Sequence, residues 1–246
     1  MIAANLPNSE WSVIEDPLSY LPCSAITEYR KGEVIYDLDR PSPNLYLVIE
    51  GCVKLTRMVG SAEVVMNLCQ TDDLFGESAF VRGNGERAVA LEPTKVMSWP
   101  VETVHEIINR HPRFGIALIQ MLASRCFDLE ERIATLSADS TSRRLAKALI
   151  HLAERLGSEA EGTSNRRLAP LSHKLLAQYI GTTREAVTHC MNQFRRQGFV
   201  AYTRRDVVVS VEALRQWLDA ERNNAPDAET AESAVDGADM ALSASA

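Results

Sequence analysis

Short runs of alternating apolar and polar residues occupy the chain from Ile26 to about Val101. The runs are rich in β-branched and aromatic residues and are separated by Gly, Pro, Asn and Asp, a pattern typical of strands and tight turns. Several strands at this spacing predict a small antiparallel barrel or roll. The strand-like stretches read AITEYRKGEVIYDL, NLYLVIEGCVKLTRM, AEVVMNLC and AVALEPTKVMSWPV.

A helical period replaces this alternation after Val101. VETVHEIINRHP predicts a short helix that Pro112 stops, and RFGIALIQMLASRCFDLEERIATL predicts a longer one. The longer helix carries a narrow apolar stripe, which we call the seam: Ile119, Leu122, Cys126, Leu129, Ile133 and Leu136. A stripe of this width is typical of a helical dimer interface, and packing against the chain's own barrel is the alternative.

The polar stretch SADSTS (137–142) predicts a hinge in which Asp139 or Ser140 caps the next helix. That helix, SRRLAKALIHLAERLG, is expected to end at Gly157, and residues 158–167 are expected to form a loop. In the following stretch, 171–211, the pattern is helix, Gly181 turn, helix and a two-stranded hairpin. This order predicts a winged helix-turn-helix.

Charge is distributed unevenly along the chain. Residues 1–141 have a net charge of −8, residues 142–220 a net charge of +6, and residues 221–246 a net charge of −5. A basic segment in an acidic chain indicates a local polyanionic partner, and we expect double-stranded DNA.

The second helix of the pair is expected to enter the major groove with its first turns at the base edges. Arg can bind guanine O6 and N7 with two hydrogen bonds and Glu can accept from cytosine N4, so Arg184 and Glu185 favour a half-site that contains G·C pairs. The alternative is a solvated Arg–Glu pair on an exposed helix. The predicted base contacts are Thr183, Arg184, Glu185, Thr188 and His189, and the predicted phosphate contacts are Ser172, His173, Lys174, Arg204 and Arg205.

Two copies joined along the seam would place two recognition helices about one helical turn of DNA apart, roughly 34–36 Å, on an inverted repeat. We therefore expect a homodimer of an α+β chain. The predicted organisation is an N-terminal segment (1–19), a β-roll sensor domain (20–112), a dimerisation helix with its hinge (113–138), a winged helix-turn-helix domain (139–220) and a disordered acidic tail (221–246).

This order of elements resembles the CRP/FNR family of bacterial transcription regulators, over residues from about 20 to 220. The motifs that carry the resemblance are YRKGEVIY with IEGCVKL, DDLFGESAF leading to ERAVA, and GTTREAVTHCMNQF. The resemblance implies a cytoplasmic regulator of transcription that works with RNA polymerase, with an antiparallel β-roll similar to cyclic-nucleotide-binding domains.

The resemblance also implies a phosphate-binding cassette in the roll. Gly76 would let the backbone approach the ligand, and the amides near Glu77 and Ser78 would donate to a phosphate. The Glu77 carboxylate would accept from the ribose 2′-hydroxyl, and Arg87 would neutralise the phosphate, with Ala88 beside it. Independently of the family, an anion buried in a roll needs a cation such as Arg87. On this basis a cyclic nucleotide (cAMP or cGMP) or a similar phosphorylated ligand is the predicted effector, sensed on the dimer helix near Leu129 and Glu130. The alternative is that Arg87 pairs with Glu77 and holds the roll shut without a ligand.

The sequence departs from the family in several positions. Leu129, Glu130 and Ala88 lack the hydroxyl groups of cyclic-AMP-responsive members. The sequence therefore does not identify which base the nucleotide carries. Asp72 stands where the family usually has glycine, and His189 stands where a second arginine usually follows. Asp tolerates a left-handed turn better than most residues, so we expect the turn to be kept.

Three other readings stay open. The roll can serve redox or gas sensing, or no ligand at all, although five scattered cysteines without a CxxC pair argue against an iron–sulfur cluster, a zinc site or a disulfide framework. Haem bound through His105 or His111 has no supporting pattern. A cyclic-nucleotide-hydrolysing enzyme is disfavoured because no histidine stands near Glu77, Ser78 and Arg87 and no metal-ligand spacing occurs, so we expect no catalytic residues.

No run of about 18 apolar residues predicts a membrane span.

Overall fold

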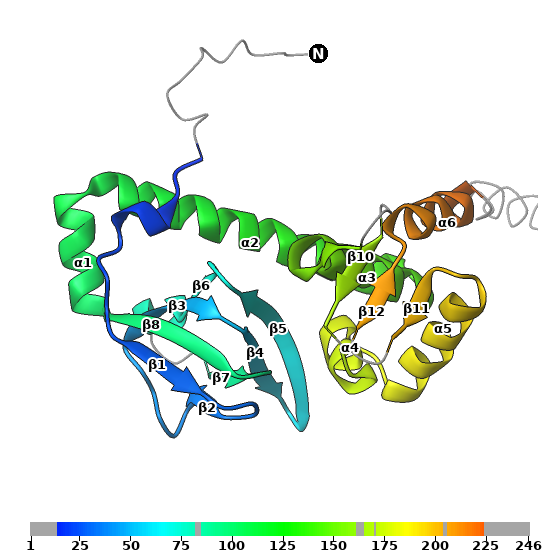
Figure 1. Cartoon of the computed structure of the whole chain (residues 1–246), viewed down its shortest axis with the longest axis horizontal. Coiled ribbons are helices and arrows are strands. Elements are labelled where there is room, and N and C mark those ends of the chain that lie inside the picture. Colours follow the sequence, from blue (N-terminus) through cyan, green and yellow to red (C-terminus); the bar gives the residue numbers. More distant parts are fainter. Residues whose placement is uncertain (1–13, 82–84, 161–164, 170, 204–205, 224–246) are drawn as a thin grey trace, which may run out of the picture. The chain divides into compact units, whose positions relative to one another are not determined.

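The computed structural model (Figure 1) describes residues 14–81, 85–160, 165–169, 171–203 and 206–223. Contacts within the chain define two compact units. One contains the chain up to Asp139 together with His173–Arg184, and the other contains Ser140–Ser172 and the chain from Glu185 onward. Helix His173–Ile180 thus groups with the first unit, whereas its sequence position lies within the predicted segment 139–220.

Two antiparallel four-stranded sheets build the roll, as the alternation predicted (Figure 1). In one sheet the strands have the order β1-β8-β3-β6 and in the other the order β2-β7-β4-β5. The strands are β1 (Ile26–Tyr29), β2 (Val34–Tyr36), β3 (Asn44–Glu50), β4 (Cys52–Val59), β5 (Ala62–Gln70), β6 (Leu74–Phe75), β7 (Glu86–Ala90) and β8 (Thr94–Pro100). Asp72 in the turn before β6 has a φ of 71°, so it does adopt the expected left-handed conformation.

Strand β3 is buried on both faces, and its alternation separates two apolar clusters. Tyr46 and Val48 point into the interior of the roll. Leu45 and Leu47 point to the opposite face, which helices cover. These are α1 (Val101–Arg110), α2 (Pro112–Ala138) and the short 3-10 helix η2 (Pro17–Tyr20). Helix η2 begins before the predicted roll boundary at residue 20, so part of the predicted N-terminal segment packs with the roll.

Helix α2 has two different long faces. Phe114 and Ala117 are buried, and Leu118 and Met121 pack partly against the same cluster as α1. The seam residues are on the other side and are largely exposed, for example Ile133 at 64%. Pro112 does end α1, and it is also the first residue of α2, because proline at the first helical position lacks only an amide that has no intrahelical partner.

The second unit has its own core. It contains helices α3 (Thr141–Leu156), α5 (Arg184–Arg196) and α6 (Val211–Asn223) and a sheet of order β11-β12-β10-β9. The strands are β9 (Ser158–Glu159), β10 (Arg166–Leu168), β11 (Val200–Tyr202) and β12 (Val207–Val209). Phe194, at 0% exposure, meets the Trp217 ring edge-on at 5.4 Å between centroids. Ser140 caps α3, its side chain accepting from the Arg143 amide, and α3 ends at the predicted Gly157.

One expected loop is partly wrong. Residues 158–167 contain β9 and the start of β10, which pairs with β12 and widens the predicted hairpin of β11 and β12 into a four-stranded sheet. The sequence signal was weak because each of these strands is only two or three residues long. Of the predicted tail, residues 221–223 belong to α6, and 224–246 lie outside the described residues, as do residues 1–13.

The turn after β6 depends on Gly76. Its φ is 90°, and an added Cβ would lie 2.6 Å from the Asn44 carbonyl oxygen and 2.9 Å from Cδ2 of Tyr46. Gly32 has a similar φ of 83° but nothing within 4 Å of an added Cβ. Both positions disfavour L side chains, and only Gly76 adds a backbone collision.

We therefore expect Gly76→Ala to lower the free energy of unfolding by about 1–3 kcal/mol more than Gly32→Ala does, because only the first substitution overpacks its surroundings. Urea unfolding of both variants measures the difference. Equal losses would mean that the left-handed backbone alone accounts for the glycine.

A carboxyl group lies at the edge of the roll's aromatic core. The Tyr36 hydroxyl donates to Glu86 Oε1 at 2.5 Å, and the Tyr36 ring stacks on Tyr46 and on Phe75. Burial raises the pKa of Glu86; the Tyr36 hydrogen bond opposes this rise, and the negative charge of Glu77 adds to it. The net direction is upward.

The folded state therefore holds the Glu86 proton more tightly than the unfolded chain does. The stabilisation from this group is complete below the ordinary glutamate pKa and is lost as the pH rises through the raised value. We expect Glu86→Gln to raise the melting temperature at about pH 7.5, and to raise it less near pH 5, where the wild-type carboxyl is more often protonated. Thermal unfolding over this range measures the effect, and a gain that grows toward acid pH would contradict it.

Candidate ligand-binding and DNA-binding sites

The predicted cassette begins at a sharp turn. Gly76 precedes the 3-10 helix η3 (Glu77–Phe80), and its left-handed conformation directs the chain from β6 into η3. Gly76, Glu77 and Ser78 thus follow directly on the end of β6. The backbone amides at this turn stay the predicted donors to a phosphate.

Glu77 forms an ion pair that the sequence interpretation missed. Its Oε1 accepts from Nη1 of Arg125 at 2.5 Å, and the side chains are 27% and 14% exposed. Nη2 of Arg125 donates to the Leu74 carbonyl oxygen, so the guanidinium of α2 binds both sides of the Gly76 turn. The other carboxylate oxygen, Glu77 Oε2, is buried and has no hydrogen-bond partner among the described atoms.

Ser78 belongs to a second polar group beside this pair. Its hydroxyl hydrogen-bonds the side chains of Glu86 and Tyr36, and both of these bonds lower the pKa of the partner. Burial is the largest influence on Tyr36 and raises its pKa far above the ordinary tyrosine value. The turn therefore presents two carboxylates and two hydroxyls to one another.

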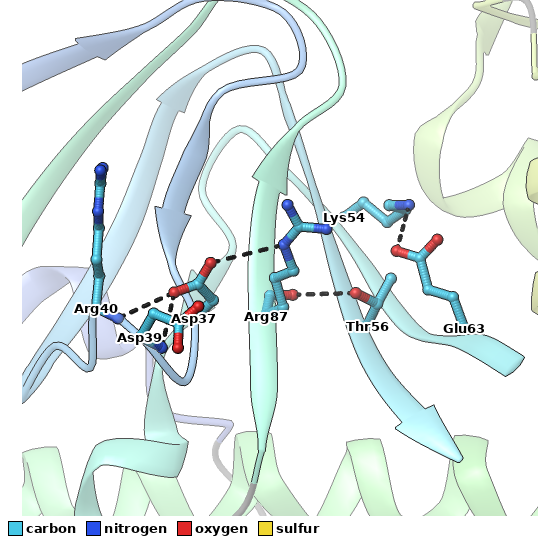
Figure 2. A network of polar contacts seen from close by, with 7 residues as sticks. All are labelled: Asp37, Asp39, Arg40, Lys54, Thr56, Glu63 and Arg87. Atoms are coloured by element: carbon cyan, nitrogen blue, oxygen red, sulfur yellow. Dashed lines mark hydrogen bonds and ion pairs between the residues drawn. The ribbon is translucent and has the colours of Figure 1, made fainter. Parts of the chain in front are cut away.

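Arg87 is not part of this group. Residues of β7 alternate between faces, so Ala88 is fully buried in the roll while the Arg87 side chain is 49% exposed. Figure 2 shows the guanidinium directed to Asp37, with Nε 3.9 Å from Oδ2. The Arg87 carbonyl oxygen accepts from Thr56 at 3.5 Å, which ties its backbone to β4. The alternative that Arg87 closes the roll by pairing with Glu77 does not occur among the described ion pairs, since Arg125 occupies that carboxylate.

The predicted sensing positions on α2 differ in their surroundings. Leu129 is half-buried and Glu130 is exposed. Arg125 precedes them by one helical turn and lies on the face that Phe114 and Met121 begin. A signal for Arg125 was present in the sequence, because it continues the stripe of that face rather than the seam.

The predicted base contacts share one exposed surface at the start of α5. Thr183, Arg184, Glu185 and His189 are exposed, and Thr188 is half-buried. The opposite face of α5 is apolar and buried, and it holds Val187, Cys190, Met191 and Phe194. The residues predicted to contact bases are thus all outside the buried face of α5, while the base contacts themselves stay predictions.

The predicted phosphate contacts are described only in part. Ser172 and Lys174 are exposed at the start of α4 (His173–Ile180), and His173 is half-buried there. Burial lowers the pKa of His173, and the nearby Arg184 charge lowers it further, so this imidazole is biased toward its neutral form. Arg204 and Arg205 lie outside the described residues. The residues on either side of them, Thr203 and Asp206, hydrogen-bond to each other in both directions.

The described ranges contain neither a candidate metal centre nor a helix suited to span a membrane. No group of three or more His, Cys, Asp or Glu side chains is placed to hold a metal ion. Within the same ranges, no helix combines the length and the apolar character needed to cross a bilayer.

Two family models match the chain. The model of the cyclic nucleotide-binding domain matches residues 26–111, and the model of the Crp-like helix-turn-helix domain matches residues 143–217. Together they cover the roll with α1 and most of the basic segment, in the order that the sequence predicted.

Curated relatives and a solved structure agree with these matches. The cyclic AMP receptor protein of Thermus thermophilus is 30% identical over 195 residues, which are 77% of this chain and 86% of the relative. The global nitrogen regulator of Synechocystis sp. is 28% identical over 189 residues, 75% of this chain and 84% of that protein. The structure of FixK2 from Bradyrhizobium japonicum is similar with a TM-score of 0.69 at 21% identity, covering 79% of this chain and 97% of that one. The chain belongs to the CRP/FNR family of transcription regulators, and its relatives are regulators rather than enzymes.

Proposed function

We propose that the protein binds an inverted-repeat DNA operator as a homodimer and that a small effector in the roll gates this binding. The observation that carries the proposal is the start of α5, where Arg184, Glu185 and His189 are exposed within the matched Crp-like helix-turn-helix segment. Hydrogen-bonding groups at the N-terminal turns of such a helix are those that reach base edges in the major groove.

The seam of α2 supports the homodimer. Its residues repeat at intervals of three and four, and Ile119 and Ile133 are 62% and 64% exposed in the single chain. Burying a side chain of this size contributes about 1.5–3 kcal/mol each, so two seams placed against each other would bury apolar surface that otherwise faces water. A second copy of the chain is the natural occupant because it offers an identical stripe.

The DNA-binding proposal is tested by selecting operators from a library of randomised inverted repeats and measuring affinities for the selected and for unrelated DNA. Arg184→Ala and Glu185→Ala should each weaken selected sites by roughly 10–100-fold, because a good base contact is worth about 1–3 kcal/mol. Binding to unrelated DNA should change little.

Lys174→Ala is the matched control at a predicted phosphate contact. It should weaken binding to all sequences about equally and reduce the salt slope by about one. Sedimentation of the complex should give two chains for each selected site. If Arg184→Ala weakens selected and unrelated DNA equally, α5 is not the recognition helix.

We propose that the effector lies at the Gly76 turn. The buried, unpartnered Glu77 Oε2 would accept a hydroxyl group, as the ribose 2′-hydroxyl of a cyclic nucleotide offers. Among the described residues, Arg125 contacts this turn, whereas Arg87 faces outward to Asp37. The matched cyclic nucleotide-binding domain model and the cyclic AMP receptor protein of Thermus thermophilus favour cAMP or cGMP as the first compounds to test.

Calorimetric titration with cAMP, cGMP and cyclic di-GMP tests this placement. Arg125→Ala should weaken effector binding by about tenfold or more, since it removes a charge-assisted contact. Arg87→Ala should leave the affinity within about threefold, as expected for a half-exposed group. The reverse order would return Arg87 to the role that the sequence suggested, and no heat with any of the three compounds would remove the cyclic nucleotide from the proposal.

An effector of this kind acts only if it binds the DNA-competent state more tightly than the other state. Its contact with Arg125 would transmit that preference to α2, which carries the seam and Leu129 and Glu130. As a regulator of transcription, the protein is proposed to work in the cytoplasm, where it would meet RNA polymerase at the operator.

A further inference from the structure

Helix α2 has a second inward-facing arginine, Arg132, with an unusual set of contacts. Its Nη1 donates to the Met66 carbonyl oxygen at 2.8 Å, and its Nη2 donates to the carbonyl oxygens of Val65 at 2.9 Å and of Tyr179 at 2.7 Å. The guanidinium carbon also lies 4.2 Å from the centroid of the Tyr179 ring. One side chain thus joins three elements of the first unit: α2, β5 and α4.

The β5 carbonyls are available because of two features of that strand. β5 is an edge strand of the sheet β2-β7-β4-β5, so one side of its backbone has no strand partner in that sheet. The pairing with β4 also shifts between Leu55 and Thr56, which pair with Asn67 and Val65, so that Met66 is left out of the register. Such a bulge leaves backbone groups unpaired, and Arg132 binds the two carbonyls at it.

The α4 carbonyl has a similar origin. Tyr179 is the next-to-last residue of α4, and the last carbonyls of a helix have no intrahelical partner and carry the negative end of the helix dipole. A cation there both satisfies an acceptor and interacts favourably with the dipole. The planar guanidinium can do this while it stacks on the Tyr179 ring, which a lysine ammonium cannot.

A second contact connects the same two elements. Nε2 of Gln178 donates to Glu63 Oε2 at 2.8 Å, and Oε1 of Glu63 accepts from Lys54 Nζ at 2.9 Å (Figure 2 shows the Lys54–Glu63 pair). Burial raises the pKa of Glu63, but the hydrogen bonds from Lys54 and Gln178 outweigh it, so the net shift is downward and the carboxylate stays charged. Glu63 of the β4–β5 hairpin therefore binds α4 directly, and the bulge is joined to α4 through Arg132.

We propose that Arg132 is a positioning residue that fixes α4, the first helix of the matched helix-turn-helix segment, to the bulged edge strand of the roll. A change in the roll that moves β5 or α2 would then act on α4 directly. The effect on DNA binding rests on the function proposed above, whereas the fixing of α4 to the roll does not.

Hydrogen exchange of the full chain without DNA or effector tests the fixing itself. Arg132→Ala should raise amide exchange in residues 173–180 and 62–70 by about tenfold, as expected for losing hydrogen bonds to a charged donor. Arg132→Lys should recover only part of this protection, because one ammonium cannot span three carbonyls and a ring.

Arg125→Ala is the matched control. It removes an arginine of the same helix that contacts the roll but not α4, and should raise exchange around residues 74–80 while leaving 173–180 within about twofold. Unchanged exchange in 173–180 of Arg132→Ala would overturn the proposal, and so would an equal rise in Arg125→Ala.

If Arg132→Ala does not fold, Gln178→Ala tests the fixing of α4 instead. It should raise exchange in 173–180 by about threefold, and no rise would refute the fixing.

DNA affinity then separates this inference from the proposed function. With α4 fixed through Arg132, Arg132→Ala should change the affinity for selected operators by about fivefold or more, while Arg125→Ala should act mainly on effector binding. If no operator can be selected but exchange in 173–180 still depends on Arg132, the proposed DNA binding fails and the fixing of α4 stands. If operators are selected but exchange in 173–180 does not depend on Arg132, the fixing of α4 fails and the proposed DNA binding stands.

Discussion

The distal half of α2 contacts the roll through guanidinium groups on backbone carbonyls rather than through apolar packing. Arg125 donates to the carbonyl of Leu74, and Arg132, seven residues later on the same face, donates to the carbonyls of Val65 and Met66. A guanidinium cannot lose its proton, so its withdrawal from water requires acceptors that are fixed in place. The strand end at Leu74 and the bulge at Met66 supply them, and thereby determine where α2 lies on the roll.

This arrangement leaves the other face of α2 for a partner. Near its start the helix is held by an apolar cluster around Phe114, and farther along by the two arginines, while most of the seam stays exposed. An exposed stripe of Ile and Leu at heptad spacing is costly in water unless another surface covers it. Helix α2 thus has one face that contacts the roll and another, the seam, that is suited to bind a second copy of the chain.

The sequence predicted the elements well where periodicity was long and regular. The longer strands of the roll, the long helix and the helix pair follow from such patterns, and the hairpin of β11 and β12 follows from the apolar runs on both sides of its turn. The two short strands within 158–167 did not, since their pairing with β12 is a tertiary effect with little local preference. The sequence also could not predict that α4 groups with the first unit. That grouping depends on contacts at the β5 bulge and at the end of α4, which have no local sequence pattern.

Arg87 illustrates why residue type alone could not define the site. It is a cation on a strand beside a Gly-Glu turn, yet strand alternation directs Glu86 and Ala88 inward and Arg87 outward, and a shift of one residue reverses every side chain. The cation at the turn instead comes from Arg125, 48 residues farther along the chain than Glu77. Only the packing of α2 on the roll brings these two residues together.

The two oxygens of Glu77 connect this packing to the proposed effector. Oε1 is held by Arg125, while Oε2 is buried without a described partner, a situation that costs about 1–3 kcal/mol. A ligand hydroxyl that donates to Oε2 would remove this penalty, and would do so at the residue that is already bound to α2. Effector binding would then stabilise the contact between the roll and α2, and not only the roll itself. Arg132 lies two helical turns farther along the same face of α2 and binds the Tyr179 carbonyl of α4. A movement of α2 caused by the effector would therefore also act on α4.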